Sequence, residues 1–333
     1  MKLISRPQMN PRPNSELGAN PVNGGLFGIG GSPMAFSAGQ WVSPNTNYVF
    51  DTKTLQPSFR MPYWIDEIRI TMHSAPTLAP SNYFTGLAGA IEARFQTGSY
   101  AFSRDFVPAG LYAPRWSAFD AGYTYAGLDA YRGFSSVRWP LPKPLFMPAG
   151  DAVQCSIRFR NYASFVDSAT AAYVTVTYVG RAAAPGSPPP AIRHIPWVSS
   201  FRKPSTDFFV HTNDEFRNPF SDKPWYVQRF TSRTYEEITD AGYSFTETQK
   251  FQGIGLGGQA IEARLYDSLG YAIVPEYTPI AHVFDTQRCA WTFGRTLGPR
   301  EQFDLQLRNS IEPEQDYSYW TMVGVVGFRE ERT

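Results

Sequence analysis

The sequence has few of the residues that catalytic centres and disulfide frameworks use. Its 333 residues include only two cysteines and four histidines. It contains no His-x-His pair, no Cys-x-x-Cys and no Gly-x-Ser-x-Gly motif, so we expect no metal, no other cofactor and no catalytic residue. Cys155 and Cys289 do not occupy equivalent positions in the repeat described below, and we expect both to be free thiols.

Charge and long apolar runs are also scarce. The net charge is +1 at pH 7, which gives no strong field to attract nucleic-acid phosphates, and no specific nucleic-acid binding is expected. The longest apolar stretch, residues 319–328, is about half the length that a membrane-spanning helix needs. The first residues lack an apolar run after Lys2 and Arg6, so we expect no secretory signal.

What the chain does have is typical of β-structure. Aromatic residues make up 16% of it, and it contains 28 prolines and 27 glycines but only 18% charged residues. Apolar and polar residues alternate along 153–160 and along 303–308, which is the period of a strand with one buried face. Many short strands joined by Pro/Gly loops predict an all-β protein built as an antiparallel sandwich or barrel.

One five-residue segment, Ala-Ile-Glu-Ala-Arg, occurs twice, at 90–94 and at 260–264, an offset of 170. Three further pairs occur in the same order: 62–65 with 224–227, 157–161 with 305–309, and 173–180 with 320–327. Their offsets are 162, 148 and 147. The offset rises from 162 to 170 between the first two matches, so we expect 8 extra residues near 231–250 in the second copy. It then falls from 170 to 148, so we expect 22 extra residues between 95 and 150 in the first copy. Four ordered matches indicate an internal duplication of a whole domain.

The duplication predicts four segments. Residues 1–44, rich in Asn, Pro, Gly and Ser, form an N-terminal arm, and the first domain covers 45–181. Residues 182–205 form a linker stiffened by Pro188–Pro190, and the second domain covers 206–333. With Lys2, Arg6 and Arg12 against Glu16, the arm is only weakly basic.

A catalytic acid and an arginine that binds substrate could be provided by Glu92 with Arg94, and again by Glu262 with Arg264. We interpret them as a structural repeat instead, because a feature kept in both copies serves what the copies share. Residues two apart on a strand lie on one face, so Glu and Arg can pair with each other or with the neighbouring strand.

The extra residues of the first copy, 106–143, are rich in aromatic residues and arginine. Such residues are favoured at the centres of protein interfaces. They are also consistent with a self-packed loop over the end of the sandwich, or with a ligand or receptor surface. The candidate interface residues are Tyr112, Arg115, Trp116, Tyr123, Tyr125, Tyr131, Arg132 and Trp139.

Two similar β-domains, an irregular arm, a proline linker and no active site resemble a double jelly-roll major capsid protein. The resemblance is to tailless icosahedral viruses of the adenovirus and tectivirus lineage, including bacteriophages, and covers residues 45–329. It rests on the paired segments Pro62-Tyr63-Trp64 and Pro224-Trp225-Tyr226, the two Ala-Ile-Glu-Ala-Arg segments and the two Arg-Asn strand ends. It implies two tandem jelly-roll sandwiches and homotrimers with six similar lobes that form a capsid lattice. It also implies a virion location after synthesis in the host cytoplasm, with other virion proteins and an internal membrane as partners.

Two other interpretations remain open at this point. The first alternative is a tandem β-sandwich protein of the virion that binds a carbohydrate or a receptor. The second is an enzyme with two cupin-like barrels, which the missing His-x-His ligands disfavour.

Overall fold

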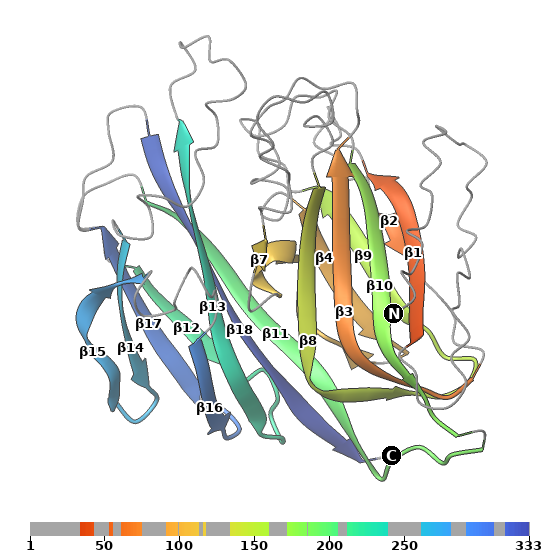
Figure 1. The fold of residues 1–333 in the computed structure, drawn as a ribbon. Helices are drawn as coiled ribbons and strands as arrows, with labels where there is room; N and C mark the ends of the chain where they lie inside the picture. The colour runs from red at the N-terminus through yellow and green to blue at the C-terminus, as the bar shows by residue number, and fades with distance from the viewer. Residues whose placement is uncertain are drawn as a thin grey trace, which may run out of the picture.

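Figure 1 shows the computed structural model of the chain. The structure describes residues 34–42, 53–55, 61–74, 91–98, 100–112, 116–117, 134–159, 172–184, 186–205, 212–238, 261–280, 291–309 and 317–332. These ranges form strands and one 3-10 helix, arranged as two β-sandwiches side by side. None of the described helical residues belongs to a helix that is long and apolar enough to cross a membrane.

The first sandwich contains the strands up to β10. One of its sheets has the order β1-β10-β3-β8-β7, and the other has the order β2-β9-β4-β5, with β6 paired to β4. The strands are β1 (Met34–Val42), β2 (Lys53–Leu55), β3 (Tyr63–Ser74), β4 (Ile91–Thr97), β5 (Tyr100–Ala101), β6 (Val107–Pro108), β7 (Trp116–Ser117), β8 (Phe134–Met147), β9 (Val153–Phe159) and β10 (Ala172–Ala182), and the helix η1 covers Ala109–Leu111.

The second sandwich contains the remaining strands. Its sheets have the orders β11-β18-β13-β16 and β12-β17-β14-β15. The strands are β11 (Ile192–Ser205), β12 (Thr212–Arg217), β13 (Trp225–Ile238), β14 (Ile261–Asp267), β15 (Ala272–Pro279), β16 (Trp291–Leu297), β17 (Gln302–Asn309) and β18 (Tyr317–Arg332).

Both sandwiches have the strand order of a jelly roll. If β5 and β6 count as one position and β7 as an addition, each domain has its first, eighth, third and sixth strands in one sheet. The second, seventh, fourth and fifth strands form the other sheet. This is the double Greek key that defines the jelly roll. The prediction of an all-β chain with two tandem jelly rolls is therefore confirmed.

Each sandwich has its own apolar core, built from alternating strand residues. In β9, Val153, Cys155 and Ile157 are fully buried, and in β17 Phe303 and Leu305 are fully buried in the same way. The first core also takes in Ile195 and Val198 of β11 and Met322 and Val326 of β18, so it continues up to the second domain.

A β-bulge recurs at the same place in both domains. It lies after Ile65 in β3 and after Val227 in β13, and a glycine faces it each time, Gly180 in β10 and Gly327 in β18. A Cβ atom on Gly180 would overlap the main-chain carbonyl of Trp64, and one on Gly327 would overlap that of Tyr226. Only glycine fits this close backbone approach, so the duplication preserved the bulge and its glycine together.

Two predicted boundaries are wrong. The arm was expected to extend to residue 44, but Met34–Val42 is the first strand of the first jelly roll and pairs with β10 along its whole length. The linker was expected to extend to residue 205, but Ile192–Ser205 is the first strand of the second jelly roll and pairs with β18. Sequence composition missed both because Gly, Ser and Pro weaken the strand pattern, whereas pairing to a long apolar neighbour supplies the missing stability.

One predicted offset also changes. Ile91 pairs with Phe159, and its counterpart Ile261 pairs with Asn309, so these strands correspond at an offset of 150 and not 148. A shift of two residues leaves every side chain on its own face, and the alternating pattern therefore does not detect it. The insertion of the first copy, measured from the Ala-Ile-Glu-Ala-Arg segment, is accordingly 20 residues and not 22.

Candidate functional site: a repeated cluster and the joint between the domains

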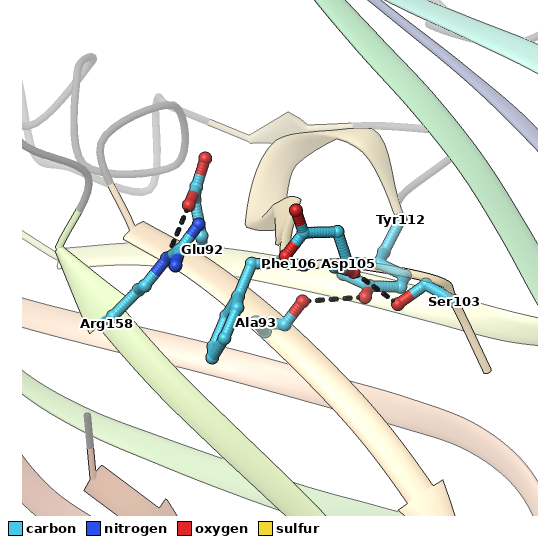
Figure 2. A network of polar contacts seen from close by, with 7 residues as sticks. All are labelled: Glu92, Ala93, Ser103, Asp105, Phe106, Tyr112 and Arg158. Atoms are coloured by element: carbon cyan, nitrogen blue, oxygen red, sulfur yellow. Dashed lines mark hydrogen bonds and ion pairs between the residues drawn. The ribbon is translucent and has the colours of Figure 1, made fainter. Parts of the chain in front are cut away.

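The repeated glutamate forms the same ion pair in both domains. Glu92 in β4 accepts a hydrogen bond from Nε of Arg158 in β9 at 2.8 Å (Figure 2). Glu262 in β14 accepts one from Nε of Arg308 in β17 at 2.6 Å. The partners lie directly opposite each other in both ladders. Of the two predicted pairings, the one with the neighbouring strand is thus the one that the structure has.

An aromatic ring completes each cluster. The guanidinium of Arg158 lies over the ring of Phe106 at 4.0 Å, and that of Arg308 lies over Tyr277 at 4.1 Å. These contacts hold the fifth strand of each domain against the fourth, and cation–π contact adds to the ion pair because the ring face carries negative charge.

A further match between the two copies identifies Phe106 and Tyr277 as equivalent residues. Tyr100-Ala101 and Asp105-Phe106-Val107-Pro108 match Tyr271-Ala272 and Glu276-Tyr277-Thr278-Pro279, all at an offset of 171. The ladders agree, because Glu92 pairs with Pro108 and Glu262 pairs with Pro279. The extra residues of the first copy therefore lie after Pro108.

The repeated arginines differ between the two copies. Arg264 donates from Nε to Oε1 of Gln306 at 2.6 Å and lies over Tyr277 at 4.5 Å. Arg94 faces Ser156, whose side chain is too short to reach it in the same way. Both domains thus share the glutamate, the arginine opposite it on the next strand and the aromatic ring. The contacts of Arg94 and Arg264 are not shared.

The fifth strand, which this cluster anchors, leads into the contact between the two domains. This contact, the joint, is formed by residues 102–112 of the first domain and the β11-β18-β13 sheet of the second. Val198 in β11 donates its main-chain N–H to the carbonyl of Phe102 at 2.7 Å. Thr231 in β13 donates from Oγ1 to the carbonyl of Leu111 at 2.8 Å. Leu111 ends η1, which lies between the two sandwiches in Figure 1. The segment 102–112 of the first domain thus covers the outer face of the sheet formed by β11, β18 and β13.

Arg229 is a buried charged residue of this joint. It is 4% exposed and donates from Nη2 to the carbonyl of Tyr112 at 2.7 Å. Burial lowers the pKa of Arg229 to about 10, so it still carries its charge at neutral pH. A cation desolvated in this way depends on its few hydrogen bonds, which makes the joint sensitive to their loss.

Tyr112 connects the joint to the repeated cluster. Its hydroxyl donates to the carbonyl of Ala93, the central residue of the repeated segment, at 2.9 Å (Figure 2). Burial is the main cause that raises the pKa of Tyr112 well above its usual value, so the hydroxyl stays protonated and remains a donor. Through Tyr112, the first copy of the repeat positions the carbonyl that Arg229 binds.

The structure alters part of the predicted interface. Tyr112 and Trp139 are fully buried and pack on each other with ring centroids 4.5 Å apart, so they belong to the core of the first domain and are not available to another chain. The sequence could not distinguish a core position from an interface position, because large aromatic residues are favoured in both. Trp116 lies in β7, although its side chain is outside the description. Arg115, Tyr123, Tyr125, Tyr131 and Arg132 lie outside the described residues.

In the described part of the chain, no three His, Cys, Asp or Glu side chains come together as a site that could hold a metal ion. Cys155 is a free thiol, as predicted, and burial raises its pKa well above the usual range. Cys289 lies outside the described residues.

No family model matches the sequence, and no curated protein matches it. Several solved structures are similar. One is described as "PBCV-1 virus capsid, quasi-atomic model", with 8% identity over 92% of this chain and 95% of that one, at a TM-score of 0.48. Another is the STIV MCP, with 12% identity over 87% and 96% of the two chains and a TM-score of 0.43. A third is the major capsid protein P2 from bacteriophage PM2, with 8% identity, 87% and 97% coverage and a TM-score of 0.38. With identities this low and TM-scores below 0.5, these structures support no inference about what this chain does.

Proposed function

We propose that this chain is the major capsid protein of an icosahedral virus, a structural protein and not an enzyme. It forms homotrimers with six similar lobes, which pack into the pseudo-hexagonal lattice of the virion. The virus is proposed to be a bacteriophage. Other virion proteins and an internal membrane are further proposed partners.

The observation that carries the proposal is the head-to-tail joint between two copies of one fold. The first domain contributes its segment 102–112, and the second contributes the outer face of its β11-β18-β13 sheet. Two different surfaces of the same fold therefore meet. A contact of this kind repeats around an axis, and it closes into a ring when the rotation permits. With two lobes in each chain, three chains give a ring of six.

The size of the assembled protein tests this proposal. The chain has a mass of 37.4 kDa, so a trimer sediments at roughly 110 kDa, and larger lattices are expected on concentration. Analytical ultracentrifugation measures the mass, and negative-stain electron microscopy shows whether the particles have six lobes. A stable monomer that binds glycans on an array would contradict the capsid role and support the carbohydrate- or receptor-binding alternative.

A further inference from the structure

The outer faces of the two equivalent sheets differ in exposure. Arg229 and Thr231, on the second sandwich, are 4% and 0% exposed because the segment 102–112 covers them. When the two sheets are aligned on the bulge, Glu67 and Arg69 of β3 are the residues equivalent to Arg229 and Thr231 of β13. Their side chains are 24% and 37% exposed and pair with each other. The first domain therefore presents to solvent the surface that the second domain uses for the joint.

The opposite half of the joint is exposed in the second domain. Tyr100 lies at the joint, where the guanidinium of Arg329 in β18 is 5.6 Å from its ring. Its counterpart is Tyr271, because each tyrosine immediately precedes the alanine that pairs with the fourth strand. Tyr271 is 68% exposed and the adjacent Leu269 is 72% exposed, which makes this turn the most exposed large apolar feature of the described chain. In Figure 1 β15 lies on the side of the second domain that faces away from the first.

The turn that presents Tyr271 is held in one conformation. Oδ1 of Asp267 accepts main-chain hydrogen bonds from Leu269 at 3.0 Å and from Tyr271 at 2.8 Å. Arg295 forms an ion pair with the other carboxylate oxygen. A preorganised apolar turn loses little entropy when it binds, which suits it to an interface.

We propose that the β14–β15 turn and β15 of one copy dock on the outer face of the β1-β10-β3 sheet of a second copy. Tyr271 then takes the place that Tyr100 has within the chain. The occupant is another copy of this chain because the two exposed surfaces are the duplicates of the two surfaces that already meet at the joint. The contact continues the joint from chain to chain, and it rests on the proposed function in requiring a closed trimer.

The first experiment compares two substitutions of exposed apolar side chains in the full chain. Tyr271→Asp is expected to raise the dissociation constant of the trimer about 10- to 100-fold, because it places a charge in a desolvated contact. Ile192→Asp is the matched control, since Ile192 is 44% exposed and lies outside both surfaces. It is expected to leave the trimer unchanged. Sedimentation gives the dissociation constants, and thermal melts show that both variants stay folded.

The second experiment cross-links the proposed neighbours. Ala182 occupies in β10 the position that Arg329 has in β18, so Ala182→Cys and Tyr271→Cys bring two thiols close across the proposed contact. In a Cys289→Ser background, where Cys155 is buried, a short bismaleimide is expected to give covalent dimers and trimers with the double variant and neither with the single ones.

The outcomes separate the inference from the function. Trimers that Tyr271→Asp does not weaken, or double-cysteine chains that link only internally or not at all, would overturn the docking surface and leave the capsid proposal intact. A wild-type chain that stays monomeric at every concentration would overturn both.

Discussion

The two domains share a fold, but they differ in how their equivalent sheets are used. The middle of the β11-β18-β13 sheet is buried on both faces, by its own core on one side and by the segment 102–112 on the other. The β1-β10-β3 sheet is buried on one face and partly exposed on the other. Because the domain is duplicated, each of the two contact surfaces occurs twice in the chain. One copy of each surface is buried at the joint, and the other copy of each is exposed.

The largest effect is expected where the copies are alike. Gly180→Val and Gly327→Val each force a side chain into the carbonyl at the bulge, and each is expected to destabilise the protein by about 3 kcal/mol or more, or to prevent folding. Urea unfolding measures both. Gly150→Ala serves as a control, because a Cβ there meets no atom within 4 Å and only its positive φ of 89° is unfavourable. It should cost about 1 kcal/mol. Equal tolerance at all three positions would show that the bulge is not needed.

The next effect separates the covered sheet from the exposed one. Arg229→Ala removes the buried donor to the carbonyl of Tyr112 and is expected to lower the free energy of unfolding by about 2–3 kcal/mol. Glu67→Ala, at the equivalent position of the first domain, should cost no more than about 0.5 kcal/mol in the monomer. Denaturant midpoints, measured at concentrations where the chain is monomeric, compare the two. Similar costs would mean that the joint does not bury Arg229 in solution.

A smaller difference is expected within the repeated cluster. The side chain of Glu92 is 3% exposed and that of Glu262 is 16% exposed, although both pair with an arginine on the next strand. Glu92→Gln should cost about 2 kcal/mol and Glu262→Gln about 1 kcal/mol, because the more buried arginine loses more when its partner is neutral. Thermal unfolding with both single variants and the double variant gives the two costs and their additivity. A larger cost at Glu262 would mean that burial of the ion pair does not set its contribution to stability.

The smallest effect concerns Asp267, a carboxylate that the second domain has at this turn and that Thr97 replaces in the first domain. Burial acts to raise the pKa of Asp267, but hydrogen bonds from Tyr271, Arg295 and Leu269 outweigh it and lower the pKa below its usual value. The carboxylate therefore stabilises the fold fully above about pH 4, and this contribution fades as the pH falls through the lowered pKa.

Asp267→Asn tests this pH dependence. The variant should be about 1 kcal/mol less stable than the wild type at pH 7, and the difference should shrink at acid pH. Unfolding midpoints from pH 2 to pH 7 measure it. Thr97→Ala, at the equivalent turn of the first domain, is the control and should show no such pH dependence. A difference that is constant over this range would mean that the charge of Asp267 does not stabilise the turn.

Much of the fold could be read from local patterns. The alternation in residues 153–160 and the duplicated segments predicted two all-β domains, and the topology confirms two jelly rolls. The strands at 34–42 and 192–205 were missed because their residues favour strands only when a long neighbour pairs with them. The interface role of Tyr112 and Trp139 was wrong because large aromatic residues suit a core as well as a contact surface.

The sequence by itself determined that this protein is a duplication of one β-fold, since matching segments and strand periodicity are local properties of the chain. Only the tertiary structure decided which surfaces of the two copies meet. The ion pair of Glu92 with Arg158 and the contact of Arg229 with Tyr112 join residues far apart in the chain. Such partners are set by the register of the strands and the packing of the sheets, and a shift of two residues in a strand changes them without changing the sequence pattern.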